Sequence, residues 1–374
     1  MTRGGTDRPT PDVPRPPGPL IWLHAGDPKL AEATRTLALR LRDVEEAEGV
    51  LVTGTHPPKD MTGAVAPADT LADARAFLTS WRPDAAVVIG FDVPPTLLVE
   101  AARKELPVLH VAGDTPPAHQ PGPRVLRPLF ETFVKRTATG AAGLAHVQAL
   151  GATDTEVVGR LADAPDAPPC NDAEREDLTR LLAGRPVWLA VGAVEDEADA
   201  LIAAQRHAGG YSHRLLHVVR PADPAAAPAF RARFDAAGFR TLLRSDGQDP
   251  DRDVQVVIAD DPGEDGLWYR LAVLTFFGGT FGPGTPVPPW GAAALGSAMI
   301  HGPETRPEHA AFDRFARAGA TAIVPAPDAL GRMVAKTASP EVAAKLAHAA
   351  WREVSAGTEA TDRIAALALR LLDA

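Results

Sequence analysis

The chain has 374 residues, of which 45% are hydrophobic and 23% are charged, and its formal net charge is -10 at pH 7. This length is too great for one ordinary hydrophobic core and predicts two domains, while the acidic balance argues against a dedicated nucleic-acid-binding protein, whose affinity rests on clustered Lys and Arg. Its one cysteine, Cys170, excludes an internal disulfide framework and a multi-cysteine metal site.

The chain begins with a Pro- and Gly-rich stretch, residues 1–19, which has no apolar core of the kind that signal peptides carry. We expect these residues to form a disordered lead. No run approaches the roughly 18 to 20 apolar residues that a transmembrane helix needs. Together with the cysteine content, this predicts a cytoplasmic protein without a transmembrane segment.

Short apolar runs alternate with segments of helical spacing through the first half of the chain. We expect strands at 20–25, 49–54, 85–90, 107–113 and 155–160, and helices at 30–41, 71–81, 96–105, 126–134 and 144–150. Because these strands are apolar on both faces and most are followed by a helix, they indicate a parallel sheet that is covered by helices on both sides.

A boundary follows, and then the pattern repeats. Residues 161–175 carry three prolines and little periodicity, which is typical of a linker. Beyond it we expect strands at 187–193, 214–220, 240–245, 254–260 and 322–326, and helices at 195–208, 227–237, 328–336, 340–355 and 359–372. The sequence therefore predicts two doubly wound (Rossmann-like) α/β domains that face each other across a cleft: an N-terminal domain at 20–160 and a C-terminal domain at 176–374.

One glycine pair stands at the centre of the second half. The segment 271–302 reads as strand, Gly/Pro-rich loop, short helix and strand, and Gly278 and Gly279 follow its first apolar run. Paired glycines after a buried strand let a ligand come close to exposed backbone N–H groups. A tight turn that binds nothing is the alternative.

Three further residues in the second half suit an anionic ligand. Gly263 and Glu264 begin a helix after the strand at 254–260, where glycine leaves N–H groups free and a glutamate accepts hydrogen bonds from ribose hydroxyls. The alternative for them is an ordinary helix cap. Arg220 ends the strand at 214–220, and its guanidinium suits a phosphate unless it is a surface arginine.

In the first half, three residues lie at or just past strand ends, where a general base can stand: His24, Asp27 and Asp92. A histidine at such a position is more often a structural one. The prolines that follow Asp92 equally indicate a rigid turn.

The segments IWLHA, WRPDAAVVIG, ALGATDTEVVGRL and IADDPGEDGLWYRLAVLTFFGGTF keep an order and spacing that resemble one family. These are the 3-deoxy-D-manno-octulosonic acid (Kdo) transferases of lipopolysaccharide assembly, which have the GT-B glycosyltransferase fold. The resemblance implies that the second domain binds CMP-Kdo as substrate and that the first binds a lipid A acceptor. It also implies inversion, no metal and no other cofactor, and peripheral attachment to the inner membrane.

Carried over to this chain, the resemblance implies a nucleotide-sugar site formed by Arg220, Gly263, Glu264, Gly278 and Gly279. The acceptor side departs from the family. Its Ser-x-Gly-Glu, whose glutamate is the proposed base, reads Asp27-Pro28-Lys29-Leu30 here, so that a leucine stands at the base position. The base candidates that remain are Asp92, Asp27 and Glu32. The family's Asn-Ala-Arg reads Ala112-Gly113-Asp114, which reverses the charge.

Three hypotheses stay open from the sequence. The first is a divergent Kdo-transferase-like glycosyltransferase that still binds a nucleotide sugar. The second is a catalytically inactive relative that serves as a binding or scaffold protein in envelope biosynthesis, together with a protein partner. The third is a GT-B enzyme that acts on an unrelated donor.

Overall fold

A computed structural model describes residues 14–43, 49–54, 61–92, 94–114, 123–161 and 167–373 of the chain. Most of the predicted lead and residues 162–166 of the predicted linker lie outside these ranges. The chain divides into two compact units. Unit 1 comprises Met1–Ala164 and Ala356–Ala374, and unit 2 comprises Pro165–Ser355.

Unit 1 is built on a seven-stranded parallel sheet with the order β3-β2-β1-β4-β5-β6-β7. Its strands are β1 (Leu20–Ala25), β2 (Gly49–Gly54), β3 (Gly63–Val65), β4 (Ala85–Ile89), β5 (Val108–Ala112), β6 (Lys135–Ala138) and β7 (Thr155–Val157). Its helices are α1 (Ala31–Asp43), α2 (Leu71–Trp81), α3 (Pro95–Arg103), α4 (Pro123–Glu131) and α5 (Ala141–Ala149), joined by the end of α13.

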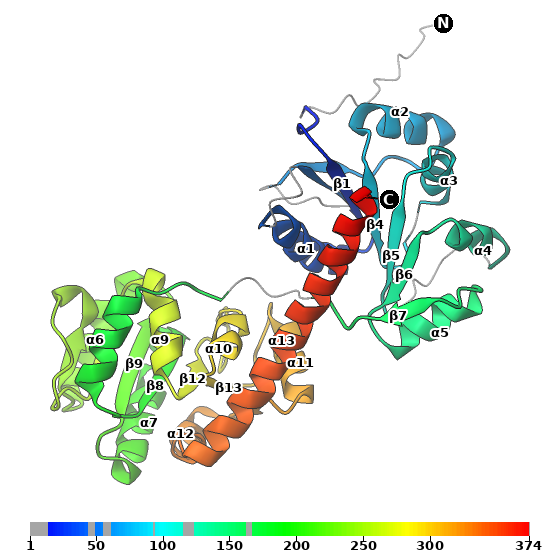
Figure 1. Cartoon of the computed structure of the whole chain (residues 1–374). Coiled ribbons are helices and arrows are strands. Elements are labelled where there is room, and N and C mark those ends of the chain that lie inside the picture. The colour runs from blue at the N-terminus through cyan, green and yellow to red at the C-terminus, as the bar shows by residue number, and fades with distance from the viewer. Residues whose placement is uncertain are drawn as a thin grey trace, which may run out of the picture. The chain divides into compact units, whose positions relative to one another are not determined.

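Alternate residues of the central strands supply two separate cores in unit 1. Leu20 and Trp22 point to one face, where α2 to α5 pack, whereas Ile21 and Leu23 point to the other, where α1 and the end of α13 pack. Figure 1 shows α1 and the red end of α13 beside the strands of this sheet. Both faces are buried, which is why these strands are apolar throughout.

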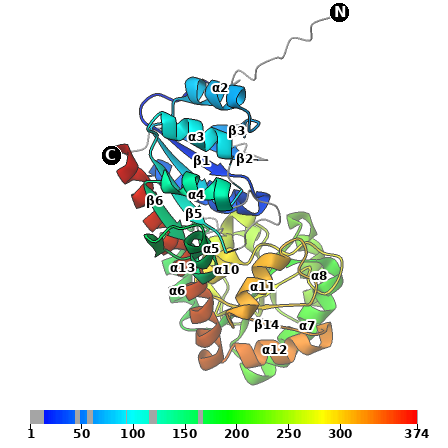
Figure 2. The same cartoon turned by 90° about the vertical axis from the view of Figure 1, so that its right-hand side faces the viewer.

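Unit 2 repeats this architecture with a seven-stranded parallel sheet of order β10-β11-β9-β8-β12-β13-β14. Its strands are β8 (Val187–Ala193), β9 (Leu216–Pro221), β10 (Thr241–Leu243), β11 (Val256–Ile258), β12 (Leu274–Phe277), β13 (Ala298–His301) and β14 (Thr321–Ile323). Its helices are α6 (Asp172–Leu182), α7 (Ala198–Tyr211), α8 (Ala227–Ala236), α9 (Asp265–Leu271), α10 (Trp290–Ala294), α11 (His309–Arg317), α12 (Leu330–Thr337) and the first part of α13 (Pro340–Arg370). Helices α7 and α12 lie side by side (Figure 2).

The two parallel sheets and their helices confirm the predicted pair of doubly wound domains, but the C-terminus differs from the prediction. Instead of helices at 340–355 and 359–372, one helix runs from Pro340 to Arg370. Gly357 lies between the two predicted helices, and a glycine inside a helix costs only about 1 kcal/mol. Residues beyond it pack into the core of unit 1, among them Ile364 and Ala368. Residues 356–374 therefore group with the first unit, whereas the sequence analysis had placed them in the second.

Four buried histidines make the fold sensitive to acid. Burial lowers the pKa of His24, His110, His217 and His301, and brings that of His110 to about 4. His217 stacks on Trp188 with ring centroids 3.7 Å apart, and neither of its ring nitrogens has a hydrogen-bond partner among the described residues. These side chains are therefore buried in the neutral form.

A lowered pKa in the folded state means that the unfolded chain binds more protons, so stability falls as the pH decreases. The contribution of His110 is complete above its ordinary value of 6.5 and is lost as the pH falls to about 4, a change of about 3 kcal/mol. Urea unfolding at a series of pH values measures how steeply the free energy of unfolding falls with decreasing pH. His217→Phe is expected to make this slope shallower, whereas His213→Asn at an exposed position is expected to leave it unchanged. An unaltered slope in His217→Phe would contradict this account.

Candidate functional site

Ligands of doubly wound sheets bind beyond the carboxyl ends of the strands, where the strand order reverses. In unit 1 this switch point lies between β1 and β4, which are neighbours in the sheet. In unit 2 it lies between β8 and β12. Both switch points hold residues that the sequence singled out.

At the switch point of unit 1, the carboxylate of Asp92 lies against the backbone of Gly26. Gly26 follows β1 and Asp92 follows β4. A Cβ at Gly26 would lie 2.3 Å from Oδ2 of Asp92, so any side chain there would displace the carboxylate. Asp92 is also exposed. The structure thus places one accessible carboxylate where a substrate hydroxyl could reach it.

His24 lies beneath this carboxylate and is held by a hydrogen-bond chain. Trp22 Nε1 donates to Oγ1 of Thr53 at 2.7 Å, and the same oxygen lies 3.0 Å from Nδ1 of His24. The imidazole also bonds to the backbone of Asp92, and burial lowers its pKa. With 3% of its surface exposed, His24 positions the turn that carries Asp92 and is itself out of reach of a substrate.

The other two base candidates are engaged by their own surroundings. Asp27 caps a short 3-10 turn (Pro28–Leu30) by accepting the N–H of Lys29 at 2.9 Å. Glu32 lies on α1 and forms a surface ion pair with Arg35 at 3.4 Å. Leu30, at the family's base position, packs so closely on the end of β4 that a Cβ at Gly90 would lie 2.8 Å from its Cδ1. Of the three candidates, Asp92 is the one whose carboxylate lies against Gly26 at the end of β1.

The charge reversal at Asp114 has a structural role that its sequence position did not reveal. Asp114 follows β5, and its Oδ1 accepts the N–H of Gly143 in the first turn of α5 at 3.2 Å. A Cβ at Gly140 would lie 2.6 Å from either carboxylate oxygen. The N-terminus of α5, which attracts anions, is therefore filled by the chain's own carboxylate.

At the switch point of unit 2, the glycine pair forms a close turn after β12. A Cβ at Gly278 would lie 2.6 Å from Cα of Ala193 on β8, so this position requires glycine. Gly279 has a φ of 70°, in the left-handed region that glycine favours. The turn directs the N–H groups of Gly279, Thr280 and Phe281 toward one point, the arrangement of an anion-binding nest.

The side chain of Glu197 occupies this nest. Its Oε2 accepts the N–H of Gly279 at 2.8 Å, and its Oε1 accepts those of Thr280 and Phe281 at 3.2 and 3.4 Å. A fourth N–H, from Val194, reaches Oε2 at 3.3 Å. Glu197 is 4% exposed, and this burial raises the pKa of its carboxyl group although the four N–H groups oppose the rise.

Arg220, the candidate phosphate ligand, is paired within unit 2. Its Nε and Nη2 donate to the two carboxylate oxygens of Asp265 at 2.8 and 2.7 Å, and its Nη1 donates to the carbonyl of Pro221. The side chains of Arg220 and Asp265 are 9% and 20% exposed. This fork-to-fork pair joins the end of β9 to the first turn of α9.

Gly263 and Glu264 are engaged as well. The N–H of Gly263 donates to the carboxylate of Asp261 at 2.8 Å, and Asp261 thereby caps a 3-10 turn (Pro262–Glu264) that precedes α9. Glu264 accepts Nε of Arg244 with both oxygens at 3.1 Å and Nε1 of Trp268 at 3.2 Å. The ion pair with Arg244, whose guanidinium lies over the ring of Trp268 at 6.0 Å from its centroid, fixes the start of α9.

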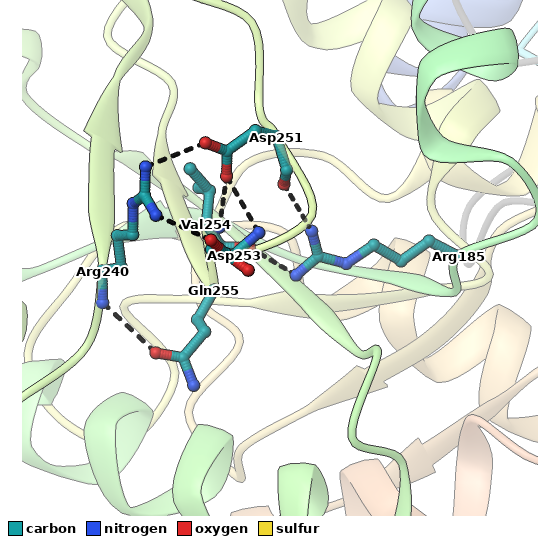
Figure 3. A network of polar contacts seen from close by, with 6 residues as sticks. All are labelled: Arg185, Arg240, Asp251, Asp253, Val254 and Gln255. Atoms are coloured by element: carbon teal, nitrogen blue, oxygen red, sulfur yellow. Dashed lines mark hydrogen bonds and ion pairs between the residues drawn. The ribbon is translucent and has the colours of Figure 1, made fainter.

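A second polar network in unit 2 lies before β11, at the amino-terminal end of the sheet (Figure 3). Asp251 accepts the N–H groups of Asp253 and Val254 and pairs with Arg240 at 2.9 Å. Arg185 donates to the backbone carbonyls of Asp251 and Val254. This network closes a loop on the side of the sheet away from the switch point, so we assign it a structural role.

Within the part of the chain that the structure describes, no group of three or more His, Cys, Asp or Glu side chains is arranged to hold a metal ion. Among the same residues, none of the helices combines the length and apolar character that crossing a bilayer requires.

Two units with all-parallel, doubly wound sheets define the chain as a two-domain α/β protein of the Rossmann-like class, to which GT-B glycosyltransferases belong. Residues 3–162 match the model of the 3-deoxy-D-manno-octulosonic-acid transferase (kdotransferase) family. The resemblance to Kdo transferases is thereby confirmed.

Curated relatives extend this similarity beyond the first unit. The 3-deoxy-D-manno-octulosonic acid transferase of Rickettsia typhi is 20% identical over 278 residues, which cover 71% of this chain and 60% of the relative. That of Rickettsia bellii is 22% identical over 279 residues, which cover 71% of this chain and 66% of the relative. The chain thus matches less than two thirds of the length of either relative.

Two solved structures from Acinetobacter baumannii are similar in fold. One is the C-terminal CMP-Kdo binding domain of WaaA. The matched region covers 49% of this chain and 99% of that domain, with 23% identity and a TM-score of 0.46. The other is MurG. The matched region covers 95% of this chain and 100% of the MurG chain, with 13% identity and a TM-score of 0.49.

Proposed function

We propose that the chain is a Kdo-transferase-like glycosyltransferase of lipid A or lipopolysaccharide biosynthesis, which transfers a sugar from CMP-Kdo or a similar nucleotide sugar. The match of residues 3–162 to the family supports the reaction class. The observation that carries the proposal is the exposed carboxylate of Asp92 over Gly26, at the carboxyl ends of two neighbouring central strands.

The proposed chemistry needs a base on the acceptor side. Asp92 accepts the proton of the acceptor hydroxyl as that oxygen attacks the anomeric carbon of the donor and inverts it. His24 and the glycine at position 26 hold the carboxylate in place, because the imidazole bonds to the backbone of Asp92 and the glycine leaves room for its side chain. The departing nucleotide phosphate requires N–H or cationic groups for stabilisation.

A second candidate function is a catalytically inactive relative that acts as a binding or scaffold protein. The donor-side residues favour it, because the polar groups of Arg220, Glu264 and Gly279 all have partners inside the chain. A nucleotide sugar that bound there would have to replace these contacts.

Thermal unfolding with ligands separates the two functions. Because a ligand that binds only the folded state stabilises it, CMP or CMP-Kdo at 100 times its dissociation constant is expected to add about 2.7 kcal/mol and to raise the Tm. UMP serves as the matched control for recognition of the cytosine nucleobase. The absence of a shift at millimolar CMP-Kdo would reject the transferase. A shift without sugar transfer to a lipid A acceptor would favour the inactive binding protein.

A further inference from the structure

The carboxylate of Glu197 stands where an external anion would be expected. Three consecutive backbone N–H groups, those of Gly279, Thr280 and Phe281, converge on it from the turn after β12. Such a nest is a general binding motif for phosphate and carboxylate groups. It also lies at the topological switch point of unit 2, where doubly wound sheets bind ligands.

Among the described residues, Glu197 has no cationic partner of the kind that usually accompanies a buried acid. Its carboxylate oxygens accept hydrogen bonds from four backbone N–H groups, the fourth being that of Val194. Elsewhere in unit 2 the buried charge of Arg220 is paired with Asp265. A carboxylate that is held only by backbone amides can be replaced by another anion of similar shape without leaving an opposite charge unpaired.

We propose that the Gly279–Phe281 nest is an anion-binding site of this chain, that Glu197 is its internal occupant in the unliganded protein, and that a phosphate ester or carboxylate ligand binds there by displacing the Glu197 side chain. This inference rests on the proposed nucleotide-sugar function, which supplies both groups: the phosphate of CMP and the carboxylate of the sugar acid. Glu197 thus acts as a competitor that sets a threshold for donor binding.

The side chain can leave without unfolding the sheet. Glu197 ends a short 3-10 turn (Glu195–Glu197) between β8 and α7, so its backbone is anchored while the side chain alone crosses to the nest. The nest itself keeps its shape, because Gly278 is bonded to Val191 of β8 and Thr280 Oγ1 is bonded to Phe277. A ligand therefore finds a preformed set of N–H groups.

Chemical rescue of a cavity variant tests the proposal directly. Glu197→Ala leaves the N–H groups without an acceptor and is expected to lower the Tm by about 5 °C or more. Acetate, formate and inorganic phosphate, added at constant ionic strength against chloride, are expected to restore most of this loss in a saturable manner. Glu197→Gln keeps the cavity filled, so its Tm is expected to rise less with these anions than that of Glu197→Ala, and the wild type, in which the charged side chain competes with them, is expected to respond least.

The second measurement concerns displacement. CMP is expected to bind Glu197→Ala at least tenfold more tightly than the wild type, whereas cytidine, which lacks the phosphate, is expected to bind both equally. Failure of every small anion to stabilise Glu197→Ala beyond Glu197→Gln would overturn the anion site. Equal CMP affinity of Glu197→Ala and the wild type would overturn the displacement.

Two features keep these outcomes interpretable. If Glu197→Ala does not fold in chloride, its refolding yield in acetate compared with chloride gives the same readout. Rescue by acetate requires neither a nucleotide nor an acceptor. It therefore succeeds or fails independently of sugar transfer, so that a failure of the proposed transferase function and a failure of the anion site are distinguished.

Discussion

Replacing Asp92 with asparagine is expected to lower the rate of sugar transfer on the order of a hundred- to ten-thousand-fold, because the amide cannot accept the proton of the acceptor hydroxyl. Asparagine has the shape of aspartate, so it keeps the close approach to Gly26. The loss should therefore fall on kcat, with little change in KM or Tm. Steady-state transfer from CMP-Kdo to a lipid A acceptor measures it.

Two neighbouring acids provide matched controls for this variant. Asp27→Asn and Glu32→Gln remove the same charge from the same unit, but their carboxylates cap a turn and pair with Arg35. Both are expected to keep the transfer rate within a few-fold of the wild type. If Asp92→Asn is as active as these controls, Asp92 is not the base.

The second large effect concerns the stability of unit 2. Asp265→Ala is expected to lower the free energy of unfolding by about 3 kcal/mol, because it leaves the guanidinium of Arg220 largely buried and unpaired. The double variant Arg220→Met, Asp265→Leu removes both charges and is expected to recover most of that loss. Urea denaturation of the two variants and the wild type measures the difference.

A surface pair in the same unit serves as the control. Asp253 pairs with Arg240 at 3.0 Å, and their side chains are 77% and 57% exposed. Asp253→Ala is expected to cost at most about 1 kcal/mol, since exposed ion pairs contribute little. A loss in Asp265→Ala no greater than that in Asp253→Ala would mean that Arg220 remains hydrated and available to an external phosphate.

The central strands were predictable from the sequence, and two of the shorter ones were not. Strands β1, β2 and β8 begin and end at the predicted residues, because strands buried on both faces are apolar without interruption. Strands β3 (GAV) and β6 (KRTA) were missed. Three or four residues of mixed polarity give no periodicity, and only pairing with a neighbouring strand makes them extended.

The candidate sites were likewise predictable in part. The positions of Asp92 and of the glycine pair were found from their place after apolar strands. The partner of the glycine turn, Glu197, was not predicted, because it is separated from Gly279 by 82 positions in the sequence. The acidic run at 195–197, directly after a buried strand, was the available signal. Arg220 and Asp265, 45 positions apart, were likewise joined only by the fold.

The single helix α13 has a consequence for the order in which the chain can mature. The apolar face of the first sheet that carries Ile21 and Leu23 is covered in part by Ile364, Ala365 and Ala368, which follow the whole of unit 2 in the sequence. A nascent first unit, although its strands emerge early, keeps that face incompletely covered until unit 2 has been synthesised. Unit 2, whose residues are contiguous, completes its own core earlier. Unit 1 is thus begun before unit 2 and completed after it.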